Sequence, residues 1–127
     1  MAGYSGTPLP KKLGIREGSR VLLQGAPQGF ARSIGVKSRP RGPADVIVAF
    51  FLEAAELRQS FARLRAALDP AGGLWIAWPK KSSGVKSDLD EGAVRGIGLE
   101  SGLVDNKVCA IDETWSGLRF VVRLRDR

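Results

Sequence analysis

The sequence of 127 residues contains no histidine and a single cysteine, Cys109. Without histidine there is no Ser-His-Asp or Cys-His nucleophile, no imidazole proton shuttle and no histidine-ligated metal. One cysteine forms neither an intrachain disulfide nor a cysteine-rich zinc site, which argues against a disulfide-stapled secreted scaffold. We therefore expect no metal and no resident cofactor. Cys109 lies inside an apolar segment and is interpreted as a core residue.

The sequence also lacks a long apolar run. The longest, residues 46–52, is far shorter than the ~20 residues that a membrane-spanning helix needs. Glycine, serine and proline interrupt any apolar stretch near Met1, so the pattern of a signal peptide is missing. These absences predict a cytoplasmic protein with no membrane contact.

The positive charge is unevenly distributed along the chain. Lysine and arginine number 20 against 13 for aspartate and glutamate, which gives a formal net charge of +7. Residues 1–43 hold eight basic residues and one acidic residue, whereas residues 44–127 hold twelve of each. The whole excess therefore belongs to the N-terminal third. It indicates attraction to phosphates, nucleic acid or an acidic surface, or else a contribution to solubility alone.

The composition fits one domain, with 43% hydrophobic and 26% charged residues. Residues 1–18 are rich in glycine, serine, proline and lysine and are interpreted as an N-terminal arm that packs on the body or stays mobile. Residues 19–127 form the single predicted α/β domain. Pro8 and Pro10 are expected to prevent an early helix.

Apolar patterning predicts five strands and three helices. The strands are expected over residues 20–24, 45–51, 74–78, 107–111 and 118–124. Helices are expected over residues 30–34 and 53–68, and from Asp88, which forms a capping box with Glu91. Residues 69–73 are read as the turn that ends the long helix. This order is typical of an open α/β sheet.

The helix end, turn and strand of residues 68–76, Leu-Asp-Pro-Ala-Gly-Gly-Leu-Trp-Ile, resemble the second half of a class I S-adenosylmethionine-dependent methyltransferase fold. The resemblance implies a truncated Rossmann-like, mostly parallel sheet of five strands with order 1-2-3-5-4 and an antiparallel last strand. Such enzymes carry an acidic, glycine-rich signature after the first strand and an acid after the second that holds the ribose. Residues 24–29 contain no acid, and the segment with the ribose acid is missing.

Four further motifs resemble an uncharacterised bacterial family, domain of unknown function number 3052. They are Gly-Tyr-Ser-Gly-Thr-Pro-Leu at 3–9, Trp-Pro-Lys-Lys at 78–81, Val-Asp-Asn-Lys-Val-Cys-Ala at 104–110 and Asp-Glu-Thr-Trp-Ser-Gly at 112–117. Because that family carries no known activity, the resemblance implies only a bacterial cytoplasmic origin.

In open parallel sheets, ligands bind beyond the carboxyl ends of the strands. Two lysines and a serine come soon after the predicted strand 74–78, and ammonium, hydroxyl and backbone N–H groups can hold a phosphate or a carboxylate. A solvated loop is the alternative interpretation. The sequence predicts a rim site for a small anionic ligand formed by Gln24, Gly25, Gly29, Glu53, Lys80, Lys81, Ser82 and Trp115.

Three functions follow from these patterns. The first is a non-catalytic or weakly catalytic module that binds a small anionic ligand at the rim. The second is a nucleic-acid-associated protein that uses the basic N-terminal third. The third, an S-adenosylmethionine-dependent methyltransferase, is disfavoured because the ribose acid is absent. The first strand, 20–24, is predicted at a sheet edge, which either the arm or a homodimer would cover.

Overall fold

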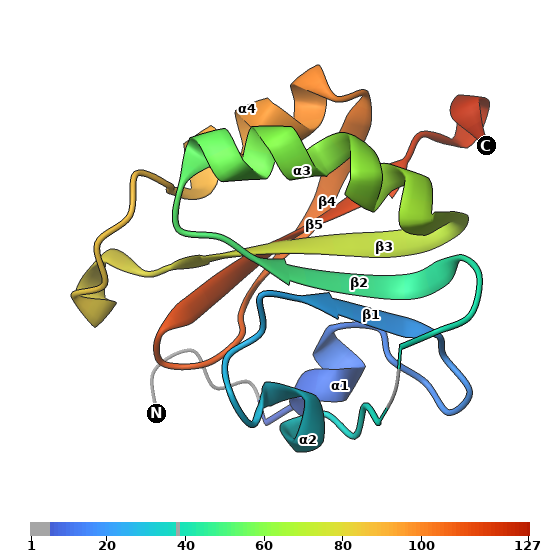
Figure 1. The fold of residues 1–127 in the computed structure, drawn as a ribbon, viewed down its shortest axis with the longest axis horizontal. Coiled ribbons are helices and arrows are strands. Elements are labelled where there is room, and N and C mark those ends of the chain that lie inside the picture. Colours follow the sequence, from blue (N-terminus) through green and yellow to red (C-terminus); the bar gives the residue numbers. More distant parts are fainter. Residues whose placement is uncertain (1–5, 38) are drawn as a thin grey trace.

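The computed structural model describes residues 6–37 and 39–127. The strands of this part of the chain form one five-stranded sheet (Figure 1). Strands β1 (Val21–Gln24), β2 (Ala44–Phe50) and β3 (Leu68–Pro79) run parallel in this order. Strand β5 (Trp115–Val122) lies antiparallel between β3 and β4 (Leu103–Ala110). The order β1-β2-β3-β5-β4 confirms the predicted sheet.

Helices lie on both faces of the sheet (Figure 1). On the upper face of Figure 1 lie α3 (Ala54–Ala67) and α4 (Glu91–Glu100). On the lower face lie two single-turn helices, α1 (Leu9–Lys12) and α2 (Phe30–Ser33). The 3-10 helices η1 (Lys81–Ser83) and η2 (Leu124–Asp126) follow β3 and β5.

The upper core lies between α3, α4 and the sheet. Leu57, Phe61 and Leu64 recur at helical spacing on α3 and are almost fully buried. On β3, Trp78 belongs to this upper core and Trp75 to the lower one, because alternate residues of a strand point to opposite faces. The two tryptophans therefore pack into different cores on opposite faces of the sheet.

The lower core joins the N-terminal segment to the sheet. The indole Nε1 of the fully buried Trp75 donates a hydrogen bond to the carbonyl oxygen of Leu13 at 3.0 Å. Leu13, directly after α1, is 1% exposed. The expectation that Pro8 and Pro10 prevent an early helix is wrong, because both stand at the start of α1, where proline costs no intrahelical hydrogen bond.

The predicted capping box is also wrong. Helix α4 begins at Glu91, and its N-cap is Asp90, whose Oδ1 accepts from the amide of Ala93 at 2.8 Å. Asp88 instead accepts from the amide of Ala54 at 2.8 Å. It therefore satisfies the first amide of α3, 34 residues earlier in the chain.

Several predicted strand boundaries shift. Strand β3 begins at Leu68 because that residue already pairs with Ala44, although Asp69 still makes a local turn by accepting from the amide of Ala71 at 2.9 Å. Strand β4 begins at Leu103 and β5 at Trp115, both earlier than predicted. The longer hairpin places Trp115 opposite Pro79 at the end of β3.

Candidate functional site

The turn after β1 packs directly on the end of β2. Gly25 has φ +65°, and a Cβ there would lie 2.9 Å from the carbonyl oxygen of Phe50. Glycine is required on both counts, because side chains rarely adopt this φ and a methyl group would meet backbone. The carboxyl ends of β1 and β2 are thereby held in contact.

Aromatic side chains fill the lower side of the same rim. Phe50 packs edge-to-face between Phe30 and Trp115, with ring centroids 5.0 Å from each. Phe30 and Phe50 are buried and Trp115 is half-buried. Trp115 thus closes the lower side of the rim by packing on the end of β2.

Lys80 is held against the hairpin between β4 and β5. Its Nζ donates to the carbonyl oxygen of Asp112 at 2.7 Å, and its amide donates to that of Thr114 at 2.8 Å. One of the three ammonium donors is therefore used, and no ion pair within the described residues involves Lys80.

The other predicted site residues do not converge. The Oε1 of Gln24 accepts from Nη1 of Arg63 at 2.7 Å, which ties Gln24 to α3. Glu53 and Gly29 are exposed at the starts of α3 and α2. Lys81 and Ser82 lie in exposed η1, which projects beyond the end of β3 and away from α2 (Figure 1). The rim brings Gly25 and Trp115 together through Phe50, with Lys80 beside the hairpin.

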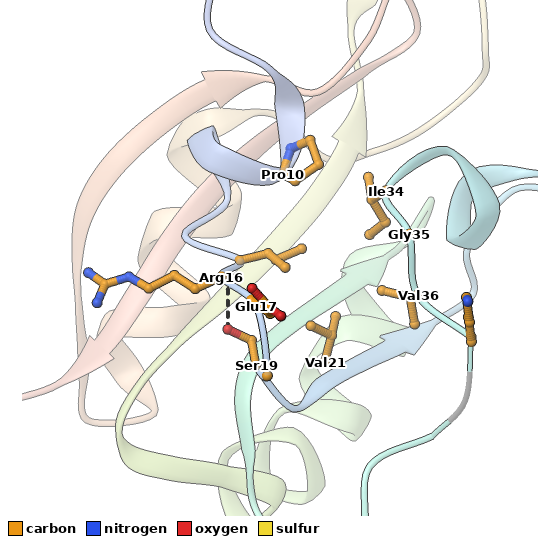
Figure 2. A pocket seen from close by; sticks show the side chains of 11 residues that line it. Pro10, Arg16, Glu17, Ser19, Val21, Ile34, Gly35 and Val36 are labelled. Atoms are coloured by element: carbon orange, nitrogen blue, oxygen red, sulfur yellow. Dashed lines mark hydrogen bonds between the residues drawn. The ribbon is translucent and has the colours of Figure 1, made fainter.

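A cavity of about 490 Å³ lies at the opposite, amino end of β1 (Figure 2). Val21, Ile34 and Val36 give it an apolar lining, and Glu17 and Lys37 add charge. The side chain of Arg16 extends away from the cavity in Figure 2. We attribute the opening to α2, which at four residues is too short to cover the lower face of β1.

The excess positive charge is gathered on one side of the molecule. We name as the basic layer α1, α2 and the segments that join them to β1 and β2, which lie below the sheet and along its β1 edge (Figure 1). The described part of this layer has one acid, Glu17. Its exposed cations are Lys11, Arg16, Arg32, Lys37, Arg39 and Arg41. By contrast, α3 and α4 carry three acidic and four basic residues.

Arg20 is the one cation at this edge with ion-pair partners within the described residues. Its Nη2 lies 3.0 Å from Asp45 Oδ1 and 3.4 Å from Asp69 Oδ2. The hydrogen bonds from the Arg20 side chain and amide lower the pKa of Asp45. Arg20 therefore fixes the starts of β1 and β2, while the exposed cations of the basic layer keep their charge free for a partner.

Sequence patterns did not bring together two cations of the antiparallel half of the sheet. Lys107 of β4 and Arg119 of β5 are directly opposite each other in the strand register. The alternation of apolar side chains along residues 118–124 places Arg119 on the opposite face of its strand from Leu118 and Phe120. Its proximity to Lys107 was not predicted because it depends on the pairing of β4 with β5.

The described chain contains no cluster of three or more cysteine, aspartate or glutamate side chains able to hold a metal ion. None of the helices formed by residues 6–37 and 39–127 has the length and apolar character that a membrane crossing requires.

Solved structures with a similar fold include methyltransferases. A putative type 11 methyltransferase from Sulfolobus solfataricus is 15% identical in sequence, with a TM-score of 0.59. The match covers 97% of this chain and 94% of the methyltransferase chain. The ribosomal protein L11 methylase from Lactobacillus delbrueckii subsp. bulgaricus is 14% identical, with a TM-score of 0.51, and the match covers 84% of this chain and 58% of the methylase chain. The chain has a methyltransferase-like fold. LepI in complex with SAM, 11% identical with a TM-score of 0.51, matches over 95% of this chain and 40% of its own.

This likeness is confined to the fold. No known protein-family profile matches the chain, and no curated protein sequence matches it. The chain spans 58% of the length of the L11 methylase. Strand β1 is the edge of the sheet, so the described residues provide no strand beyond it to carry a ribose-binding acid.

Proposed function

We propose that this chain is a non-catalytic nucleic-acid-binding module built on a methyltransferase-like fold, with the basic layer as its contact surface. The observation that carries the proposal is the one-sided charge. The charged residues up to position 43, all of them described, supply the entire excess of +7, and they belong to the basic layer below the sheet and along its β1 edge. A surface of this kind attracts phosphates and releases their counterions on binding.

The chemistry of the layer favours the backbone of a duplex over unstacked bases. Within the described part of the basic layer the only aromatic residue is Phe30, which is buried against Phe50. Single-strand binding relies on exposed aromatic rings that stack on bases. Lysine and arginine contacts to phosphates position a duplex without reading its sequence.

The test measures the fluorescence anisotropy of a short labelled DNA duplex between about 50 and about 200 mM salt. Arg39→Glu/Arg41→Glu reverses two charges in the basic layer. The matched control, Arg58→Glu/Lys86→Glu, reverses two exposed charges in α3 and in the loop before α4. We expect the first variant to bind at least about 10-fold more weakly and to reduce the salt slope by about two. The control should change little, because salt screens charges beyond ~10 Å.

Two results contradict the proposal. One is the absence of binding by the unaltered chain at the lowest salt. The other is equal weakening by both variants, which would indicate dependence on net charge alone. Binding to vesicles of phosphatidylserine and phosphatidylcholine without binding to the duplex would assign the basic layer to a membrane surface instead.

A small anionic ligand at the rim is a second candidate, supported by Lys80. Its ammonium is fixed by the carbonyl of Asp112 and keeps two further donors without an acidic partner among the described residues. Thermal shift with AMP and with citrate tests this candidate. The shift should disappear in Lys80→Ala/Lys81→Ala, and an undiminished shift would contradict the rim as the binding site.

A further inference from the structure

The lower face of β4 and β5 carries two cations in direct opposition. Lys107 and Arg119 are register partners. Like charges directly opposite on paired strands are destabilising. Figure 1 shows α1 and α2 beneath β1, and the end of α1 reaches β4, where Lys107 lies beside Lys12. Lys107 is exposed and Arg119 is half-buried, so solvent reaches the pair, and the opposition of their like charges comes at a cost to the folded state.

Arg119 is positioned by the absence of a side chain at Gly73. A Cβ on Gly73 would lie 2.6 Å from Nη2 of Arg119 and closer still to Nε. The guanidinium therefore lies along β3 in the space that any other residue at position 73 would fill. The neighbouring strand holds this arginine half-buried in a defined place.

No carboxylate neutralises this guanidinium within the described residues. Its Nη1 donates to the neutral Oδ1 of Asn106 at 3.3 Å, and the ion pairs of the described chain do not include it. Burial, with a smaller effect from the nearby Arg127, lowers the pKa of Arg119. Its surroundings therefore disfavour the charged form of the guanidinium, and a bound anion would stabilise that form.

The pair is continuous with the basic layer. Lys107 Nζ donates to the carbonyl oxygen of Lys12 at 3.3 Å, at the end of α1. A duplex lying along the basic layer could therefore extend onto the lower face of β4 and β5.

We propose that Arg119 and Lys107 form a phosphate site that takes one backbone phosphate of the duplex. This inference rests on the proposed function and identifies its best-defined contact. The guanidinium offers a planar fork of donors suited to two phosphate oxygens, and the ammonium adds a point charge. Inorganic phosphate has the same chemistry and is the alternative source of the bound group.

Two variants test the guanidinium while leaving the net charge unchanged, one by removing it and one by displacing it. Arg119→Lys keeps the charge and removes the fork. Gly73→Ala keeps Arg119 itself, but the added methyl group occupies the place of the guanidinium. Arg125→Lys, at an exposed arginine of η2, is the matched control. Urea unfolding of each variant verifies that it is folded.

The readouts are the dissociation constant for the labelled duplex and the thermal shift caused by inorganic phosphate at constant ionic strength. We expect Arg119→Lys and Gly73→Ala each to weaken duplex binding by about 5- to 10-fold, and Arg125→Lys by less than about 2-fold. The phosphate-induced shift should be smaller in the first two variants than in the control.

The outcomes separate this inference from the proposed function. If the unaltered chain binds the duplex and Arg119→Lys binds as tightly as Arg125→Lys, the phosphate site is wrong while the proposed function stands. If the unaltered chain fails to bind the duplex but phosphate stabilises it through Arg119, the site takes a free phosphate and the proposed function is wrong. If neither ligand binds, both are overturned.

Discussion

Two glycines of α4, two positions apart, should respond oppositely to alanine. Gly96 is exposed, and a Cβ there would meet nothing within 4 Å. An alanine gains helix propensity at no packing cost, so Gly96→Ala should raise the free energy of unfolding by about 1 kcal/mol. At Gly98 the same gain competes with overpacking.

The added methyl group at Gly98 has no room. A Cβ there would lie 2.7 Å from Cδ1 of Phe120 and closer to two other atoms of that ring. Phe120 is 0% exposed and packs edge-to-face on Phe61 with centroids 5.7 Å apart, so its ring cannot yield. Overpacking costs about 1 to 3 kcal/mol, and this contact belongs at the upper end. Gly98→Ala should therefore lower the free energy of unfolding by about 2 kcal/mol, since packing outweighs propensity.

Urea unfolding at pH 7, followed by the fluorescence of the buried Trp75 and Trp78, measures both variants against the unaltered chain. The expected difference between the two variants is about 3 kcal/mol. An alanine at position 98 that proved as stabilising as the one at position 96 would refute the reasoning, because it would mean that α4 does not pack against Phe120 as described.

Asp45→Asn should narrow the difference in stability between pH 7 and pH 3. The pKa of Asp45 is lowered in the folded chain, so the carboxylate's contribution to the free energy of unfolding is present above the ordinary aspartate pKa of 3.8 and is lost as the pH falls through the lowered pKa. Urea unfolding at both pH values that shows the same stability difference in the variant as in the unaltered chain would contradict this. S-adenosylmethionine should not bind at micromolar concentrations, because the described residues form no strand beyond β1 that could carry an acid for the ribose hydroxyls. Calorimetry that shows binding at that affinity overturns this expectation. No described residue before β1 forms a strand, so we expect the β1 edge to pair with a second copy; light scattering that shows a monomer at all concentrations speaks against this dimer.

Periodicity was enough to predict the core of the long helix. Leu57, Phe61 and Leu64 follow a helical repeat in the sequence, and all three are buried in the structure. The opposite orientation of Trp75 and Trp78 follows in the same way from the two-residue repeat of a strand. Both patterns are local, because the backbone geometry of one segment decides which residues share a face.

Helix capping shows where local patterns fail. Asp88 with Glu91 three residues later has the spacing of a capping box, yet Asp90 caps α4. Asp88 is used by Ala54, which the fold brings beside it although 34 residues separate the two. An aspartate satisfies whichever free amide is nearest in space, and sequence spacing cannot reveal a distant helix start.

At the rim site, the sequence predicted some of the neighbouring residues but not the path of the loop after β3. The parallel strand order predicted which ends of the strands would meet, and Gly25, Phe50 and Trp115 do meet there. The path of the chain beyond β3 was not predictable, and η1 carries Lys81 and Ser82 away from the turn after β1 (Figure 1). Loop direction depends on hydrogen bonds to the neighbouring hairpin, such as that of Lys80 to Asp112.

The sequence by itself determined the order of the five strands and of the helices α2, α3 and α4, the sheet order through its resemblance to methyltransferases, and the assignment of all the net charge to the first 43 residues. Only the tertiary structure decided that this charge lies on one side of the sheet, that Arg119 lies opposite Lys107, and that the Arg119 guanidinium occupies the space left by Gly73. The physical reason is distance along the chain. Helix and strand periodicity act between near neighbours, whereas a charged surface and a paired cation are made by strand pairing and packing between residues that are far apart in sequence.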